Sequence, residues 1–460
     1  DLEGALEMLM AHKNAYGGDQ PWLSMLDQVV SAKFEDVTVR ARALYAAEQR
    51  TEGDTILEDV VTWTANAWTR GLDLPRPLPQ RKRKVVILAN QSLPQCTHYR
   101  VEQKRYVLEA AGFEVEIFDW TEVSEFLTAS PDACAAFFYR VPAFPGVVKA
   151  ILSARAQGVA TYYEIDDLIF DPANYPDPFE SFQGQISWDV YQGLIYGTTL
   201  YRSAMRLCDF ALASTTPLAR KMEEEVRSRR SFVLRNGLDS RNLGLEAPLS
   251  TRKRRPGRIR IVYGSATLAH NQDFHDMAGD GLRAVMDRHP EVELCIIGHL
   301  DLGDAFSAYG DRVIKVELLR DPRAYWALLA ECDINLAVLS PSQMADCKSE
   351  IKWLEAAVFS IPSVLSATET YREVVEDGVT GLLAQSPEEW ERALEQLVAD
   401  AALRTRIGAA ARQAALRRYS VEASAEAVSE ALQPALSAAA EGTTKKRILL
   451  VNVFFPQQSI

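Results

Sequence analysis

The chain has 460 residues, 47% hydrophobic and 25% charged, which is long enough for two or three domains with full cores. Its formal net charge of -13 argues against nucleic acid as the main partner, because such proteins usually carry a basic surface. The six cysteines include no Cys-x-x-Cys pair, and no window approaches about 18 uninterrupted apolar residues. We therefore expect a reduced, cytoplasmic protein whose contact with a membrane would be peripheral.

Residues 1–80 are predicted to form a helical N-terminal extension. Apolar residues recur three and four positions apart in LEGALEMLMAHKNAY, PWLSMLDQVVSAKF and ILEDVVTWTANAWTRG, which is the spacing of one helix face. The sequences Gly-Gly, Asp-Gln-Pro and Glu-Gly-Asp separate these stretches and predict breaks between helices.

The period changes at Lys84, where short apolar runs begin to alternate with amphipathic segments. The runs VVILAN, FEVEIFDW, CAAFFYRV and VATYYEI are predicted strands, and stretches such as GVVKAILSARAQG are the helices between them. Strands of a parallel sheet are buried on both faces, so their sequences are continuously apolar. Residues 81–245 are therefore predicted to be a Rossmann-like domain.

A second alternating set predicts another Rossmann-like domain at residues 246–420. Its strands are RIRIVYGS, VELCIIGH, RVIKVEL, DINLAVLS and PSVLS. The basic stretch TRKRRPGRIR before it is either a phosphate or membrane patch or a solvated linker.

Alanine-rich helices are predicted to follow. One long helix is expected over 387–420, in PEEWERALEQLVADAALRTRIGAAARQAALRRYS. A second is expected in SVEASAEAVSEALQPAL and belongs to a C-terminal helical segment at 421–445. Residues 446–460 resemble the first strand of a further domain. Because the chain also starts at Asp1 without a methionine, we expect a segment of a longer polypeptide.

Two doubly wound domains that face each other leave a cleft at the carboxyl ends of their sheets, where such folds bind ligands. The first strand of the second domain ends in VYGSATLAHNQDF, so Gly264 and Ser265 lie where backbone can approach a ligand closely. Neither G-x-G-x-x-G nor a P-loop sequence occurs, which argues against nicotinamide and P-loop chemistry.

The stretch DCKSEIKWLEAAVFSIPSVLS, residues 346–366, is the strongest candidate site. Ser349 is a predicted N-cap for a helix from about Glu350, whose N-terminus and the adjacent Lys348 would attract a diphosphate. Lys352 and Glu355 are three apart and share a face one turn deeper. A carboxylate there can accept hydroxyls of a ribose, so the stretch predicts a nucleotide site.

Other candidates follow strands of the first domain. In YEIDDLIF, Asp166 and Asp167 come directly after a strand, so one could act on an acceptor hydroxyl, although adjacent aspartates also form caps and turns. His98 and Arg100 follow the first strand and either contact an acceptor or phosphate or start a helix.

A metal site is not expected. His270 and His275 are five apart, which is the wrong spacing for a helical zinc pair, and no third ligand is near them.

Several motifs resemble the retaining glycosyltransferases of family 4, which have the two-domain GT-B fold. KSEIKWLEAA, IPSVLS and YREVVEDGVTGLL are similar to the C-terminal signature of that family. RNGLD at 235–239 and YGSATLAHNQDF at 263–274 add to a resemblance that spans roughly residues 84–430.

The resemblance implies transfer of a sugar, with retention, from a nucleotide-diphosphate donor in the C-terminal domain to a hydroxyl acceptor in the N-terminal domain. By the resemblance, Glu355 would bind the donor ribose. From the positions of the residues themselves, we expect Lys348 to bind the diphosphate and Asp166 to take part in catalysis. The nucleotide sugar is a co-substrate, and neither a cofactor nor a metal is implied. The acceptor would be a glycan or a lipid-linked sugar in polysaccharide or glycoconjugate synthesis, at the inner face of a membrane.

Two departures from the family pattern keep other functions open. Cys347 stands eight positions before Glu355, where the family has a glutamate, so Asp346 or Glu350 would have to replace it. His270, Asn271 and Gln272 stand where a basic pair is expected, so Lys348 or Lys352 would have to compensate. The alternatives are a sugar-nucleotide epimerase, a phosphorylase, and a non-catalytic module with adjoining domains in a larger protein.

Overall fold

The computed structural model describes residues 1–16, 20–72, 81–182, 184–243, 257–266, 271–319 and 321–441. The basic stretch at 251–256, His270 and the predicted strand at 446–460 lie outside this part. The predicted domain limits 81–245 and 246–420 remain predictions, because residues 73–80 and 244–256 are outside it as well.

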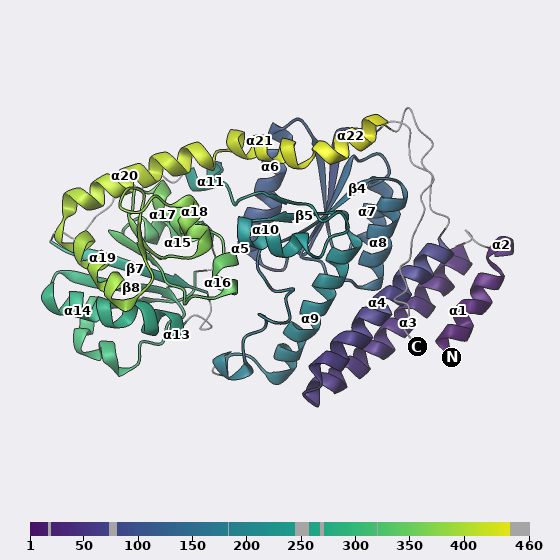
Figure 1. The fold of residues 1–460 in the computed structure, drawn as a ribbon, viewed down its shortest axis with the longest axis horizontal. Coiled ribbons are helices and arrows are strands. Elements are labelled where there is room, and N and C mark those ends of the chain that lie inside the picture. Colours follow the sequence, from purple (N-terminus) through teal and green to yellow (C-terminus); the bar gives the residue numbers. More distant parts are fainter. Residues whose placement is uncertain are drawn as a thin grey trace, which may run out of the picture.

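Two parallel six-stranded sheets carry the described fold (Figure 1). The first has the strand order β2-β1-β3-β4-β5-β6 and the second β12-β11-β10-β7-β8-β9. The strands of the first sheet are β1 (Lys84–Ala89), β2 (Glu114–Asp119), β3 (Ala135–Tyr139), β4 (Ala160–Ile165), β5 (Phe210–Ala213) and β6 (Ser231–Val233). Those of the second are β7 (Ile259–Ser265), β8 (Val292–Gly298), β9 (Val313–Val316), β10 (Ile334–Ala337), β11 (Ser363–Ser366) and β12 (Leu382–Ala384).

The strands have the burial that their sequences predict. Every residue of β1, β3, β10 and β11 is buried, as continuous apolar runs in a parallel sheet require. The predicted α/β fold class, with two Rossmann-like domains and an N-terminal helical region, is confirmed.

Helices connect the strands within each domain. Those of the first are α5 (Pro94–Thr97), the π-helical turn η1 (His98–Glu102), α6 (Gln103–Ala110), α7 (Val123–Ala129), α8 (Pro145–Ala156), the short turn η2 (Phe179–Phe182), α9 (Trp188–Leu207) and α10 (Thr216–Glu223). Next come α11 (Ser240–Leu243), α13 (Asn271–Asp273), η4 (Phe274–Gly279), α14 (Asp280–Arg288), η5 (Asp304–Arg312), α15 (Pro322–Leu329), α16 (Gln343–Cys347), α17 (Ile351–Val358) and α18 (Glu369–Val374). The cleft residues described below come mainly from the loops and helices that follow β1, β4, β7 and β10.

The N-terminal helices α1 (Leu2–Ala11), α2 (Lys13–Tyr16), α3 (Gln20–Ala46) and α4 (Arg50–Gly71) lie beside the first domain in Figure 1. α4 packs against α8 and α9, and the Trp68 indole donates a hydrogen bond to the Pro145 carbonyl at 3.1 Å. Apolar residues of α3 and α4 share one core with the first sheet. The helical region is therefore a third layer on one face of this domain.

One predicted break between these helices is wrong. α4 continues through Glu52-Gly53-Asp54, and the chain turns earlier, at Glu48, where φ is +59°. Gly53 has a packing role, because a Cβ there would lie 2.4 Å from Cε1 of the Tyr45 ring.

The single helix predicted over 387–420 is also wrong, because it is two helices, α19 (Pro387–Ala399) and α20 (Ala401–Arg418). Asp400 is extended between them and caps α20, with Oδ1 accepting a hydrogen bond from the Leu403 amide at 2.9 Å. α21 (Val421–Ala431) then returns to the first domain, where Val428 packs into the core beside β1. α22 (Gln433–Glu441) follows it along the top of Figure 1. Within the described residues, no helix has the length and apolar character needed to cross a membrane.

Candidate active site

A cleft of about 400 Å³ lies between the carboxyl ends of the two sheets. Most of the residues predicted for a site line it together, and His98 does not. The predicted residues that line it are Arg100, Asp166, Asp167, Gly264, Ser265, Lys348, Ser349, Lys352 and Glu355.

Glu355 lies on α17, the short helix after β10, and is buried although it lines the cleft. Its Oε1 accepts hydrogen bonds from the Tyr99 hydroxyl at 2.7 Å and the Trp326 indole at 2.8 Å. Its other oxygen, Oε2, takes no hydrogen bond from the described part of the chain. Burial raises the pKa of Glu355, although the two hydrogen bonds and the nearby Lys352 oppose the shift.

Two of these partners were not predicted from the sequence. Tyr99 belongs to η1 of the first domain, so its bond to Glu355 joins the two domains. Trp326 belongs to α15, where its apolar neighbours predict only a core position. The one usable signal was the location of Tyr99 in the loop after the first strand, beside His98 and Arg100.

The start of α17 corrects the predicted cap. Glu350 is the N-cap residue, and the Ser349 hydroxyl instead accepts a hydrogen bond from the Asn236 amide at 3.1 Å. The Glu350 carboxylate accepts a hydrogen bond from the Tyr419 hydroxyl at 2.7 Å. The helix begins at Ile351, which lines the cleft, so the positive end of its dipole lies at the cleft.

Two lysines place positive charge at this end of α17. Lys348 Nζ lies 3.1 Å from Asp167 Oδ2, in an ion pair between the domains. Burial lowers the pKa of Lys348, but the Asp167 carboxylate outweighs it, and the pKa is raised overall. Lys352 Nζ lies 5.1 Å from the centre of the Tyr263 ring, and burial together with Lys348 lowers its pKa to about 8.

Asp166 faces the cleft from the first domain and is held by Arg140. The two groups approach to 3.2 Å, and Arg140 follows β3 in a left-handed conformation with φ of +50°. Burial raises the pKa of Asp166, but Arg140 and Arg100 outweigh burial and leave it below the ordinary value. Asp166 therefore keeps a negative charge at neutral pH. Arg140 is a further residue that no sequence motif indicated.

Gly264 and Ser265 end β7 at the cleft, as predicted. A Cβ on Gly264 would lie 3.2 Å from the Tyr325 ring, which also lines the cleft. The neighbouring β8 ends at Gly298 with φ of +93°, where a Cβ would lie 2.1 Å from the Ser265 carbonyl oxygen. Glycine at 298 thus allows the backbone of Ser265 to keep its position.

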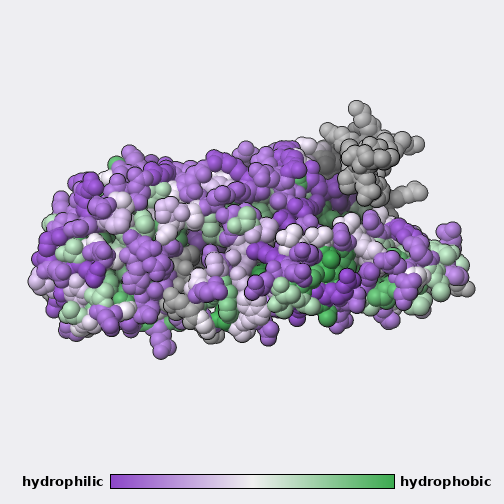
Figure 2. All heavy atoms as spheres, turned by 60° about the horizontal axis from the view of Figure 1, so that its bottom comes forward, coloured by the Kyte–Doolittle hydropathy of each residue, from purple (hydrophilic) through white to green (hydrophobic). Residues whose placement is uncertain are grey.

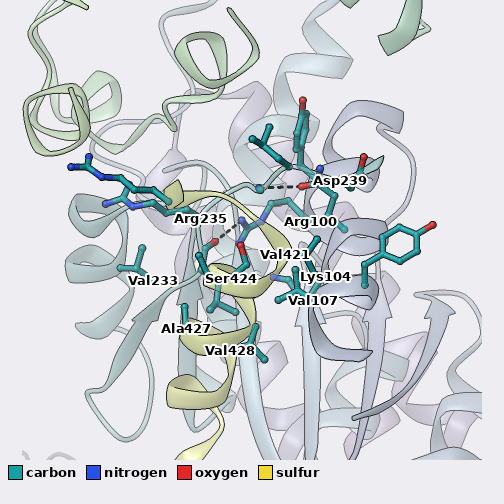
Figure 3. Close-up of a pocket in the computed structure, with 18 of the residues that line it drawn as sticks. Arg100, Lys104, Val107, Val233, Arg235, Asp239, Val421, Ser424, Ala427 and Val428 are labelled. Atoms are coloured by element: carbon teal, nitrogen blue, oxygen red, sulfur yellow. Dashed lines mark hydrogen bonds between the residues drawn. The ribbon is translucent and has the colours of Figure 1, made fainter. Parts of the chain in front are cut away.

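His98 and Arg100 are both buried, with different partners. The His98 ring packs edge-on against Tyr99, with ring centres 4.7 Å apart, and burial lowers its pKa. Arg100 forms an ion pair with Glu164 at 2.5 Å and donates to the Leu234 carbonyl at 2.7 Å. Figure 3 shows Arg100 in a second cavity of about 290 Å³. Lys104 and Val107 lie on one side of it, and Ser424, Ala427 and Val428 of α21 lie on another.

Of the residues at the two departures from the family pattern, Cys347, Asn271 and Gln272 do not line the cleft. Cys347 is buried, and its carbonyl accepts a hydrogen bond from the Thr215 hydroxyl at 2.9 Å. Asp346 accepts a hydrogen bond from the Glu369 amide at 2.8 Å, and Asn271 from the Asp301 amide at 2.7 Å. Among the described residues, no three His, Cys, Asp or Glu side chains are grouped as metal ligands would be.

Known proteins resemble this chain chiefly in fold. Residues 280–430 match the family described as glycosyl transferase-like. The Anabaena protein HepE, solved in complex with UDP-glucose, is 16% identical, with a TM-score of 0.51 over 76% of this chain and 99% of its own. Sucrose-phosphate synthase from Thermosynechococcus elongatus is 13% identical, with a TM-score of 0.51 over 78% of this chain and 100% of its own.

A glycosyltransferase from Rickettsia africae is 11% identical, with a TM-score of 0.53 over 77% of this chain and 99% of its own. No curated protein matches the chain. The fold is GT-B. The residues matched by the glycosyl transferase-like family run from α14 of the second GT-B domain into α21 and include α17 with Lys352 and Glu355.

Proposed function

We propose that this GT-B protein is a retaining glycosyltransferase of the family 4 type, which moves a sugar from a nucleotide-diphosphate donor to a hydroxyl acceptor. The observation that carries the proposal is the cleft itself. Lys348, just before α17, and Lys352 and Glu355 on it line the cleft together with Asp166 and Asp167 of the other domain. The family match and the fold shared with a protein solved with UDP-glucose support it.

The donor would bind on the second domain. Glu355 Oε2 is available to accept ribose hydroxyls, and Oε1 is already oriented by Tyr99 and Trp326. The diphosphate would lie at the start of α17, near Ser349, where the helix dipole and the two lysines favour negative charge. Gly264 and Ser265 would allow the donor to approach the end of β7 closely.

Positive charge from lysine beside the diphosphate would assist departure of the nucleotide. Lys348 would exchange its ion pair with Asp167 for one with the diphosphate, which leaves Asp167 free to accept a hydrogen bond from the acceptor hydroxyl. Asp166 is a weak base because its pKa is low, so its role would be electrostatic. Its negative charge would face the positive charge that develops at the sugar carbon under attack.

The acceptor hydroxyl would approach the face from which the nucleotide departs, which preserves the anomeric configuration. Closure of the cleft would exclude the water that otherwise hydrolyses the donor. We place the reaction in polysaccharide or glycoconjugate synthesis, on a glycan or lipid-linked acceptor at the inner face of a membrane. No metal or cofactor enters this proposal.

Substitution of Glu355 by glutamine tests the donor assignment. Glutamine keeps the shape and can still accept from Tyr99, but it removes charge-assisted bonds worth roughly 1.5–3 kcal/mol each. The Kd for UDP, measured by calorimetry, should rise about 10- to 100-fold. Glu422→Gln, at an exposed position on α21, is the matched control and should bind UDP like the wild type.

An unchanged Kd in Glu355→Gln would contradict the donor assignment. UDP binding by the wild type without turnover of any nucleotide sugar would instead indicate a non-catalytic module. Release of free sugar or an epimerised donor without an acceptor would favour the epimerase alternative. Inverted configuration of the transferred sugar, determined by NMR of the product, would contradict retention.

A further inference from the structure

The segment between the cleft aspartates and α9 has an unusual composition. Residues 166–191 contain six acidic residues, six aromatic residues, and neither lysine nor arginine. The aromatic residues are Phe170, Tyr175, Phe179, Phe182, Trp188 and Tyr191. A connection of this length with little regular structure is uncommon in compact domains and is often functional.

Four of these rings form one cluster at the start of α9. The rings of Trp188 and Tyr191 are stacked, with centres 5.3 Å apart and planes at 29°. Phe179 lies 5.0 Å from Trp188, and Phe182 lies 6.0 Å from Tyr191, in both cases measured between ring centres. Trp188 is 37% exposed, so part of its surface is open to solvent. We call Phe179, Phe182, Trp188 and Tyr191 the aromatic platform.

The aromatic platform belongs to the segment that begins in the cleft. Asp166 and Asp167, the first residues of this segment, both line the cleft. The Arg50 guanidinium of α4 donates to the Tyr175 carbonyl at 2.7 Å and fixes the segment against the N-terminal helices.

The figures agree with this position. In Figure 1 the segment lies below α16, at the lower end of α9 and on the side where the two domains meet. Figure 2, in which this lower edge comes forward, shows hydrophobic patches among hydrophilic surface on the same face.

We propose that the aromatic platform is a subsite for saccharide units of the acceptor, next to the hydroxyl that receives the sugar. A pyranose ring presents an apolar face of C–H groups, which packs on an aromatic ring, while its hydroxyls donate to carboxylates. The exposed face of Trp188 and the neighbouring Asp177 and Asp189 supply both kinds of contact. This inference rests on the proposed function, and it specifies an acceptor that already carries sugar units.

The charge of the segment argues against other occupants. Asp166 and Asp167 are paired with Arg140 and Lys348, but among the described residues no ion pair reaches the other four carboxylates of the segment, which repel anionic lipid headgroups and phosphates. A membrane surface or a second nucleotide therefore fits poorly. A neutral polyhydroxylated chain has no such penalty. A second copy of this protein would bring the same acidic segment and would be repelled as well.

Binding of neutral oligosaccharides tests the subsite. Maltohexaose, cellohexaose and chitohexaose are offered to the wild-type protein, and binding is followed by saturation-transfer NMR and titration. At least one of these sugars should bind, and Trp188→Ala should raise the Kd for that sugar about 2- to 10-fold. Tyr106→Ala removes an aromatic side chain that is 48% exposed on α6 and should bind the same sugar like the wild type.

Binding of none of the three sugars, or equal binding by Trp188→Ala, would overturn the proposal. So would a change in sedimentation of Trp188→Ala without a change in sugar binding, because the platform would then be a contact between copies. The UDP titration of Glu355→Gln separates this outcome from failure of the proposed function, since it reports the donor half alone.

Discussion

Lys352 is the cleft residue whose charge changes within an accessible pH range. Its pKa is lowered to about 8 by burial and by Lys348, while Glu355 and Asp273 oppose the shift. The lysine is protonated below this pH and neutral above it. A bound diphosphate favours the charged form, so affinity should fall as pH rises through 8, by up to about tenfold per pH unit.

The measurement is the Kd for UDP at pH 7.0 and at pH 9.5. Lys352→Arg should flatten the profile, because guanidinium stays charged at both values. Lys348 should not contribute to the decline, since Asp167 raises its pKa above the ordinary value. A wild-type Kd that is equal at both pH values would show that Lys352 does not face the diphosphate.

Some cleft residues could be predicted at this scale and others could not. The sequence identifies Lys348, Lys352 and Glu355 because they lie within eight consecutive positions, on and just before one short helix. Tyr99 and Trp326 contact Glu355 from 256 and 29 positions away. The contact of Tyr99 depends on how the two domains meet, and that of Trp326 on how α15 packs against α17 within the second domain. Local sequence encodes neither arrangement.

At the scale of elements, the position of α17 depends on its contact with α20. Gly408 of α20 lies against the turn after α17, where a Cβ would come within 2.1 Å of the Ser360 carbonyl oxygen. Ser360 has φ of +56°, so its backbone has little freedom to move away. Gly408→Ala should therefore destabilise the protein by about 1–3 kcal/mol, the usual cost of overpacking.

Gly193 of α9 provides the matched control, because a Cβ there would meet nothing within 4 Å. Gly193→Ala should stabilise the protein by up to about 1 kcal/mol through helix propensity alone. Denaturant unfolding followed by circular dichroism distinguishes the two variants. Equal midpoints for both would mean that α20 can shift without cost to α17.

Element types were more predictable than element ends. Strands such as β1 and β4 follow from apolar runs, whereas the sequence pattern predicts the wrong helix limits at Gly53 and Asp400, for opposite reasons. Gly53 is a breaker by composition but permits close packing of Tyr45, and Asp400 ends a helix inside an alanine-rich pattern. In both cases the deciding interaction is a single contact that periodicity does not register.

At the scale of the whole molecule, α10 of the first domain lies against α16 and α18 of the second. The Thr216 hydroxyl donates to Glu373 at 2.9 Å, and Lys221 donates to Gln343 at 2.6 Å. Arg220 and Glu369 form an ion pair across the same contact. Since residues of both domains line the cleft, these contacts favour the arrangement that binds a ligand.

The charge exchange Arg220→Glu with Glu369→Arg tests this coupling. Glu369→Arg alone replaces an exposed pair, worth about 0.2–1 kcal/mol, by repulsion, so the Kd for UDP should rise about 2- to 10-fold at low salt. The double variant restores opposite charges and should recover most of the affinity. In about 1 M salt, where the screening length is about 3 Å, Glu369→Arg and the wild type should converge. Failure of the double variant to recover affinity would mean that residue 369 acts through a local effect, because a contact between the domains must depend on the charges of both partners.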